Sequence, residues 1–390
     1  MTTAFLLSAV LAAWAGACAA SDEKMGANSE GRRTVPKERS MDAGPAYVKT
    51  GNCEKAKPIV AVDNVCAWPN LTLLPDGTIV ATIFNKPSHG QMAGDVDCWA
   101  SEDGGRTWRL RGAATPHEPD GTRMNEATGL ARNGDLVVLC SGWSDKILEG
   151  QERWNDGPFR AGILSAWVCR SSDGGRTWRV GKDAFPKRGP DGGSCIPFGD
   201  ILPGKDGDLR AAIYTVIKGR PDRVYIYRSR DDGKTWGDPV PMEEKVLRNE
   251  TALLHLGDGK WLAAARGNGL ALYASEDDGK TWTCRGDVTG LAQHPGHLLR
   301  LKDGRLLLTY GNRTEGDKCV EVRVSGDEGK TWSGPMRVVD FEGDGGYPAS
   351  VQRADGQVVT AYYASQTEGH SRYHMGVVIW DPAKSLGGCE

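Results

Sequence analysis

The chain has 390 residues, with 48 Lys and Arg against 51 Asp and Glu, so its formal net charge at pH 7 is −3. This balance, together with the lack of any Lys/Arg run, argues against a nucleic-acid binder that relies on bulk positive charge. The 52 glycines and 13 tryptophans, beside only 6 phenylalanines, are typical of a turn-rich all-β protein.

Residues 1–20 are predicted to be a secretory signal peptide. An apolar stretch that begins at Ala4 is followed by small residues, and it is too short to span a membrane. Cys18 leaves a lipid-anchored form open as the less favoured alternative. Residues 21–45 are polar and lack periodicity, so we expect a flexible linker there and a folded domain over 46–390. A secreted or periplasmic protein without a transmembrane span is therefore expected.

The cysteines do not form a metal-binding pattern. None makes a CxxC pair or lies near His at zinc-finger spacing, which excludes a structural zinc site of that type. Two interpretations stay open: Cys53 and Cys389 pair where the two ends of the domain meet, or the cysteines are isolated buried thiols. The acidic loop Asp340–Asp344 is rich in Gly, which favours a turn over a Ca²⁺ site. We therefore expect no metal and no cofactor.

One octapeptide, S-x-D-x-G-[KR]-T-W, recurs five times, and repeats of this kind define repeat architectures. Its Asp can accept hydrogen bonds from backbone N–H groups in a tight turn, its Gly permits positive φ, and its Trp buries a large face. Each copy follows an apolar strand, so each is expected to be a hairpin turn. The copies are Ser101–Trp108, Ser171–Trp178, Ser229–Trp236, Ser275–Trp282 and Ser325–Trp332.

A second turn signal alternates with the octapeptides. Short apolar runs flank six tight turns with the sequence Asp-Gly or Asn-Gly, and the first five are each followed by an octapeptide. Six similar units, each able to supply four strands, predict an all-β six-bladed β-propeller. The turns lie at Asp76-Gly77, Asn133-Gly134, Asp206-Gly207, Asp258-Gly259, Asp303-Gly304 and Asp355-Gly356.

The innermost strands of a propeller direct one end toward a shared axial pocket. The strand before each Asp-Gly turn is expected to start at this pocket, and the strand after the turn returns to the same face. The returning strands bring Arg266 and Arg313, two charged groups on otherwise apolar strands. The starting strands place around the same mouth Trp68, Asn125, Glu126, Ser194, Cys195, Glu250, His294, His297 and Tyr347.

The octapeptide is the Asp-box, or bacterial neuraminidase repeat, and its five copies make about residues 55–380 resemble the sialidase superfamily. The motif is specific for the fold, lies at the periphery of family members and is only weakly specific for activity. The resemblance implies a Tyr nucleophile, a neighbouring Glu that deprotonates it and three Arg that hold the substrate carboxylate. A neutral Tyr suits an anomeric carbon that carries a carboxylate, because an Asp or Glu nucleophile would be repelled, and Arg binds carboxylates in a bidentate way.

Several segments match this pattern in part. Arg248-Asn-Glu250-Thr and, sixteen residues later, Ala264-Ala-Arg266-Gly-Asn are similar to the family's Glu and second Arg. Arg313, in Tyr-Gly-Asn-Arg313, is the candidate third Arg. Gly345-Gly-Tyr347-Pro-Ala-Ser resembles the nucleophile segment, so the resemblance implies that Tyr347 attacks and Glu250 activates it.

The first Arg is missing. Family members carry it in a Phe/Tyr-Arg-Ile-Pro motif before the first Asp-Gly turn, where this chain has Cys66-Ala67-Trp68-Pro69. The acid/base Asp is expected in the loop before the first octapeptide. Asp95 is our choice, and His89 is the alternative because its ordinary pKa lies near neutrality.

The remaining candidates are expected to bind the sugar. Trp68 stacks on a sugar face or belongs to the core, and His294 and His297 are pocket residues whose neutral hydrogen-bonded form is favoured. The leading hypothesis is an exported sialidase-like glycoside hydrolase that removes a terminal acidic sugar, sialic acid or a related carboxylated sugar, from a glycan.

The alternatives are a His-dependent glycosidase or polysaccharide lyase on the same scaffold, and a carbohydrate-binding propeller without turnover. The oligomeric state stays open.

Overall fold

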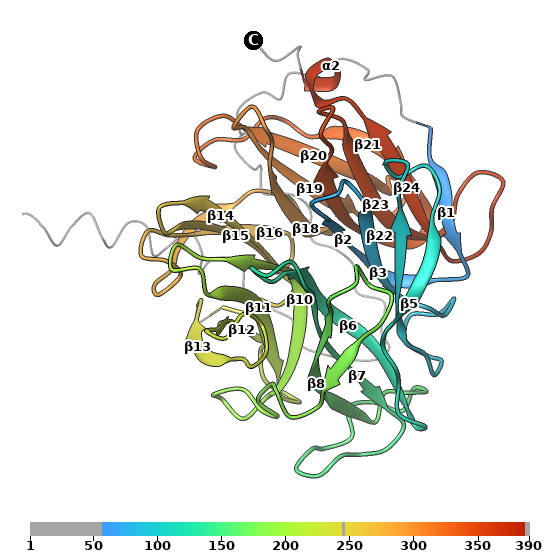
Figure 1. Cartoon of the computed structure of the whole chain (residues 1–390), viewed down its shortest axis with the longest axis vertical. Coiled ribbons are helices and arrows are strands. Elements are labelled where there is room, and N and C mark those ends of the chain that lie inside the picture. The colour runs from blue at the N-terminus through green and yellow to red at the C-terminus, as the bar shows by residue number, and fades with distance from the viewer. Residues whose placement is uncertain (1–56, 244–245, 387–390) are drawn as a thin grey trace, which may run out of the picture.

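The computed structural model describes residues 57–243 and 246–386, and almost all of the regular structure in these ranges is β-strand. The strands form six four-stranded units around a common centre (Figure 1), which confirms the six-bladed β-propeller predicted from the repeats. The expected signal peptide, the expected linker and both Cys53 and Cys389 lie outside the described residues. One short helix, α2 (Pro382–Leu386), follows the last strand.

The first three blades run in chain order from the innermost strand to the outermost. The strands are β2 (Cys66–Leu73), β3 (Ile79–Phe84), β4 (Val96–Ser101) and β5 (Arg109–Thr115); β6 (Gly121–Leu130), β7 (Leu136–Ser144), β8 (Gly162–Ser171) and β9 (Arg179–Gly181); and β10 (Ser194–Pro203), β11 (Leu209–Val216), β12 (Arg223–Ser229) and β13 (Gly237–Pro241).

The other three blades follow the same plan. Their strands are β14 (Thr251–Gly257), β15 (Lys260–Arg266), β16 (Leu270–Ser275) and β17 (Thr283–Asp287); β18 (Gln293–Arg300), β19 (Leu306–Asn312), β20 (Cys319–Ser325) and β21 (Met336–Asp340); and β22 (Glu342–Gln352), β23 (Val358–Gln366) and β24 (His374–Trp380), to which β1 (Ile59–Asp63) is added.

The ring is closed by the first strand, which completes the last blade. Strand β1 pairs antiparallel with β24, with Ile59 opposite Val377, so the blue and red ends of the ribbon lie side by side in Figure 1. At the axis, β6 and β10 pair in parallel through Ala127 to Gly129, which joins the second and third blades into one eight-stranded sheet. The β6–β10 pairing holds two neighbouring blades together by backbone hydrogen bonds, and the β1–β24 pairing joins the first strand of the chain to the last blade.

The two turn signals have separate places in each blade. The Asp-Gly and Asn-Gly turns connect the first and second strands, and the Asp-boxes connect the third and fourth, at the outer edge. In the second Asp-box, Asp173 accepts hydrogen bonds from the Ser171 hydroxyl at 2.7 Å, the N–H of Arg176 at 3.0 Å, and the N–H and hydroxyl of Thr177 at 2.9 and 2.6 Å. One carboxylate therefore accepts hydrogen bonds from three residues of the turn.

Asp173→Ala is expected to destabilise the fold by roughly 1–2 kcal/mol, because a comparable carboxylate cap on backbone N–H groups contributes about this much. The free energy of unfolding from urea titration measures the loss. Asp183→Ala on the same blade is the matched control, since the Asp183 side chain is 87% exposed and its ion pair with Lys187 is long, at 3.8 Å. Equal stability of the two variants would contradict a structural role for the Asp-box carboxylate.

Six of the seven cysteines in the described ranges fit the second cysteine interpretation, and the seventh, Cys284, does not, because it is disulfide-bonded. The six are buried thiols without a disulfide, namely Cys66, Cys98, Cys140, Cys169, Cys195 and Cys319. Burial raises the pKa of these thiols, to about 12 for Cys98 and about 11 for Cys195, so they pack as small apolar side chains.

Candidate active site

A β-hairpin places Glu250 opposite Arg266. Strands β14 and β15 pair with Thr251 opposite Ala265, and the backbone N–H of Arg266 donates to the carbonyl of Glu250 at 3.2 Å. The sixteen-residue spacing in the sequence is therefore one hairpin folded about the Asp258-Gly259 turn. Both side chains leave the hairpin at its axial end, where they meet Tyr347 of β22.

Tyr347, Glu250 and Arg266 form one hydrogen-bonded cluster. The Tyr347 hydroxyl donates to Glu250 Oε1 at 2.9 Å, and Arg266 Nη1 donates to the same hydroxyl at 2.8 Å and also contacts Glu250 Oε2. Tyr347 is only 4% exposed, and burial together with the Glu250 charge raises its pKa well above the ordinary value. The phenol is therefore neutral near pH 7, and it becomes a nucleophile when its proton passes to Glu250.

The backbone and the ring of Tyr347 are both held in place. Its φ of +54° lies in the left-handed region, which a bulky residue rarely adopts and which carries strain of order 1–3 kcal/mol. The ring stacks on Trp68, with centroids 4.5 Å apart and an interplanar angle of 14°. Such strain is found where a fold fixes a side chain for function, and here it accompanies an aromatic ring with a single defined orientation.

Asp344, three residues before Tyr347, organises the other side of the site. Its carboxylate accepts hydrogen bonds from Arg313 Nη2 at 2.8 Å, the Tyr363 hydroxyl at 3.0 Å and the Tyr373 hydroxyl at 3.1 Å, and it lies 3.0 Å from His89 Nδ1. Burial by itself would raise the pKa of Asp344, but His89 and Arg313 outweigh it and lower the pKa to about 2. The guanidinium of Arg313 then lies 5.4 Å from the centre of the Tyr347 ring.

This lowered pKa predicts a pH-dependent contribution of Asp344 to stability. Because the folded pKa lies below the ordinary 3.8, the stabilisation is fully present above about pH 4 and is lost as the pH falls toward 2. Wild type should exceed Asp344→Asn by about 2 kcal/mol at pH 5, and the difference should shrink at pH 3. Urea titrations at both pH values measure it, with Asp156→Asn, whose side chain is 96% exposed, as the control. A difference that does not change with pH would contradict the account.

The two candidate acids lie in different surroundings. His89 contacts the edge of Trp68, with ring centroids 5.3 Å apart, and pairs with Asp344, so it belongs to the cluster around Tyr347. Asp95 pairs with His117 Nδ1 at 2.6 Å, and its backbone N–H donates to Asn85. No hydrogen bond or ion pair within the described ranges connects Asp95 to Tyr347 or Glu250.

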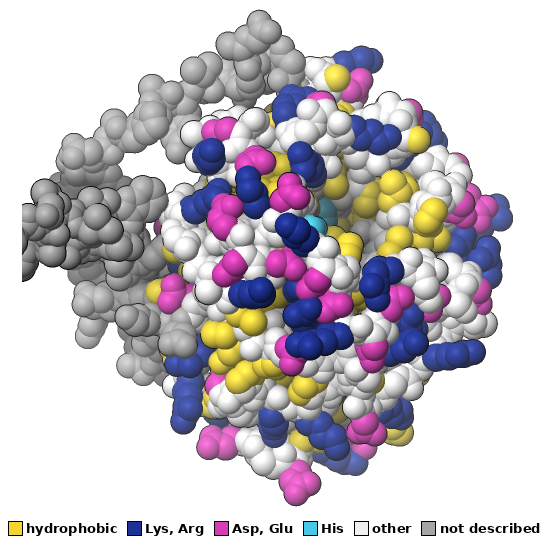
Figure 2. All heavy atoms as spheres, turned by 60° about the vertical axis from the view of Figure 1, so that its left-hand side comes forward, with side chains coloured by type: hydrophobic (Ala, Val, Ile, Leu, Met, Phe, Trp, Pro, Cys, Tyr) yellow, Lys and Arg dark blue, Asp and Glu magenta, His cyan; other side chains and the backbone are white. Residues whose placement is uncertain are grey.

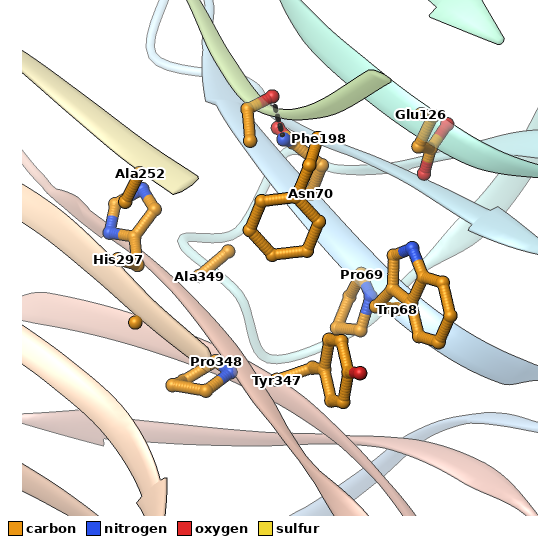
Figure 3. A pocket seen from close by; sticks show the side chains of 12 residues that line it. Trp68, Pro69, Asn70, Glu126, Phe198, Ala252, His297, Tyr347, Pro348 and Ala349 are labelled. Atoms are coloured by element: carbon orange, nitrogen blue, oxygen red, sulfur yellow. Dashed lines mark hydrogen bonds between the residues drawn. The ribbon is translucent and has the colours of Figure 1, made fainter. Parts of the chain in front are cut away.

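The other two histidine candidates, His294 and His297, also lie in different surroundings. Burial and the charges of Arg266 and Arg313 lower the pKa of His294 to about 3, so His294 is neutral and belongs electrostatically to the site. His297 lies deeper along the axis, where its Nε2 is 3.1 Å from Asp200. Figure 3 shows His297 on the opposite side of the axial cavity from the stacked rings of Trp68 and Tyr347.

Some residues of the site carry no recognisable sequence signal. Asp344 lies in strand β22, so the interpretation of the Gly-rich segment Asp340–Asp344 as a turn was wrong. Tyr363 and Tyr373 look like ordinary β-strand aromatics. Asp222 is another: Asn249, next to Glu250, donates to it at 3.2 Å, and burial raises its pKa to about 6. The proximity of Asp344 to Tyr347 along the chain is the one signal that could have identified it.

The described part of the chain offers no metal centre and no membrane helix. Residues 57–243 and 246–386 contain no group of three or more His, Cys, Asp or Glu side chains arranged to hold a metal ion. None of these residues belongs to a helix with the length and hydropathy that a bilayer crossing requires. On the face in Figure 2, acidic and basic side chains are interspersed and form no single-sign patch.

The fold and its repeats define a six-bladed β-propeller with BNR-type repeats, an architecture that solved sialidases share. The family model for the BNR repeat-like domain matches residues 55–290, more than half of the chain, so this chain belongs to the BNR repeat-like family. No curated protein matches the sequence.

Solved structures share the propeller at low sequence identity. A Dyadobacter fermentans protein of unknown function is 24% identical with a TM-score of 0.70, and the match covers 84% of this chain and 98% of that one. The Hadza microbial sialidase Hz136 is 20% identical (TM-score 0.62; 82% and 66% covered), and the Trypanosoma rangeli sialidase bound to the inhibitor DANA is 18% identical (0.62; 83% and 56%). The chain thus spans 66% and 56% of the length of these two sialidases.

Proposed function

We propose that this protein is an exported glycoside hydrolase that removes a terminal acidic sugar, sialic acid or a related carboxylated sugar, from glycans with retention of configuration. The observation that carries the proposal is the hydrogen bond of 2.9 Å from the Tyr347 hydroxyl to Glu250, with Arg266 on the same hydroxyl. A neutral nucleophile paired with a base suits a substrate whose own carboxylate repels an anionic one. Export rests on the apolar segment in residues 1–20.

The proposed reaction has two displacement steps. In the first, Glu250 accepts the Tyr347 proton while the phenolic oxygen bonds to the anomeric carbon, and the bond to the leaving oxygen breaks as that oxygen takes a proton from the acid. In the second, the same acid, now a base, removes a proton from water, whose oxygen displaces Tyr347, and Glu250 returns the proton. Of the two acid candidates we favour His89 over Asp95, because His89 contacts Trp68 and Asp344 beside the nucleophile.

One observation favours the second candidate function, a propeller that binds glycans without hydrolysing them. Arg266 contacts Glu250, and Arg313 contacts Asp344 at 2.8 Å, so both predicted carboxylate clamps already have an acidic partner. An arginine that is already paired gains less from a substrate carboxylate than an unpaired one.

Hydrolysis of a panel of fluorogenic glycosides tests the proposal. The panel contains sialosides, uronosides and neutral glycosides, and the wild type is measured beside Tyr347→Phe. Turnover of an acidic glycoside that is lost in the variant supports the hydrolase. Turnover that survives in Tyr347→Phe would point to the His-dependent glycosidase or lyase, and binding on a glycan array without turnover would point to the second candidate.

A further inference from the structure

We propose that Arg160, from the loop between β7 and β8, holds the carboxylate of the acidic sugar in place of the missing first Arg. This inference rests on the proposed function and names the contact that such a substrate needs. Ala67 stands where the resemblance places that Arg, and it is fully buried with no side chain able to reach a ligand. Arg160 was not a candidate from the sequence, because its segment matches no motif.

Arg160 lies against the loop that carries His89. Its Nη2 donates to the backbone carbonyl of His89 at 2.5 Å, and a Cβ added to Gly90 would lie 3.1 Å from the same nitrogen. The added Cβ would also collide with Met124, which packs in one core cluster with Ala67, Trp68 and Tyr347. The guanidinium therefore stands beside the candidate acid, next to the core that supports the nucleophile.

The backbone around Arg160 is fixed before any ligand arrives. The carbonyl of Arg160 accepts from the N–H of Asn155 at 2.9 Å, and the next residue, Ala161, donates to Ser144 and accepts from Trp154, both at 2.9 Å. The guanidinium also lies 4.5 Å over the Trp143 ring. This preorganisation lowers the entropic cost of binding an anion.

The charge of Arg160 is less compensated than that of the other two arginines. Arg266 and Arg313 each pair with a carboxylate, whereas no acidic side chain in the described ranges forms an ion pair with Arg160. Burial lowers the pKa of Arg160, opposed by Tyr214, while Glu250 raises that of Arg266 against its burial. Tyr214 packs in the same core cluster as Trp68 and Tyr347, beside the reaction centre.

A partly buried cation without an anion has lost hydration, and for Arg160 the His89 carbonyl and the Trp143 ring replace only part of it. A substrate carboxylate would restore that loss through charge-assisted hydrogen bonds, which are the strong class in proteins. Arg266 and Arg313 can then keep their roles beside Glu250 and Asp344. The structure thus assigns recognition of the anion chiefly to a residue of the second blade.

The test compares an acidic sugar with its methyl ester, which keeps the sugar ring but carries no charge on the carboxyl group. Arg160→Gln is expected to raise KM for the acidic glycoside about 10- to 100-fold, in line with the loss of hydrogen bonds to a charged group, and to change KM for the ester less than threefold. The KM of Arg160→Lys for the acidic glycoside should lie between the wild-type value and that of Arg160→Gln. Arg153→Gln on the same loop, where Arg153 is 48% exposed, is the matched control. Thermal unfolding of each variant verifies folding.

The experiment distinguishes failure of the role of Arg160 from failure of the proposed function. An equal effect on the acid and the ester, or none on either, in a wild type that turns over acidic glycosides overturns the role of Arg160 and leaves the hydrolase standing. Calorimetry of the free acidic sugar with Tyr347→Phe, and with the double variant that carries Tyr347→Phe and Arg160→Gln, separates binding from chemistry. If the folded wild type neither hydrolyses nor binds any acidic sugar, both the proposed function and the role of Arg160 are overturned.

Discussion

Tyr347→Phe is expected to reduce turnover of an acidic glycoside by a factor of about 10³ or more, because the variant removes the nucleophilic oxygen and leaves the ring in place. The stacking on Trp68 is preserved, so KM should change far less than kcat. Steady-state kinetics with a fluorogenic glycoside measure both constants.

Tyr362→Phe is the matched control for this loss. Tyr362 is also fully buried, and its hydroxyl has no hydrogen-bond partner among the described residues, so its removal should leave kcat unchanged. A Tyr347→Phe variant with more than a tenth of wild-type kcat would show that another group attacks the anomeric carbon.

Glu250→Gln is expected to lower kcat by a factor of about 10²–10⁴, the usual range for losing a positioned general base. The amide can still accept the hydrogen bond from Tyr347, but it cannot take the proton. Arg266 also loses its ion pair with Glu250, and its unpaired charge favours the phenolate, which offsets only part of the loss. Single-turnover rates isolate the effect on the chemical step.

Glu126→Gln is the matched control for the loss of kcat in Glu250→Gln. Burial raises the pKa of Glu126 well above its usual range and so favours the neutral form, which an amide of the same shape resembles. Glu126 lines the same axial cavity as Tyr347 (Figure 3). If Glu126→Gln lowers kcat as much as Glu250→Gln does, the assignment of the base is wrong.

The fold was predictable because its signals are local and repeated. Each Asp-box needs Ser, Asp, Gly, Thr and Trp at fixed offsets to satisfy one turn, as Asp173 does with four hydrogen bonds, so the sequence must display the pattern. Counting two independent turn signals then defines the number of blades. The closing strand β1 has no such signal, since its pairing with β24 joins residues more than 300 positions apart.

The site was predictable only where hairpin geometry connects its members. Glu250 and Arg266 meet because a tight turn folds one strand onto the next. The contacts of Asp344 with His89 and Arg313 join three blades, and no spacing along the chain encodes such a meeting. The choice between His89 and Asp95 likewise depends on the course of one loop, because both lie within seven residues of sequence.

The central claim, a covalent bond between Tyr347 and the sugar, is tested most directly by trapping it. The probe is an acidic sugar with fluorine beside the anomeric carbon and a fluoride leaving group, which forms the intermediate faster than water removes it. We predict that digestion and mass spectrometry find the sugar on the peptide containing Tyr347, and on no peptide of Tyr347→Phe. Hydrolysis of the natural glycoside with inverted configuration, or labelling of a different residue, would contradict the account.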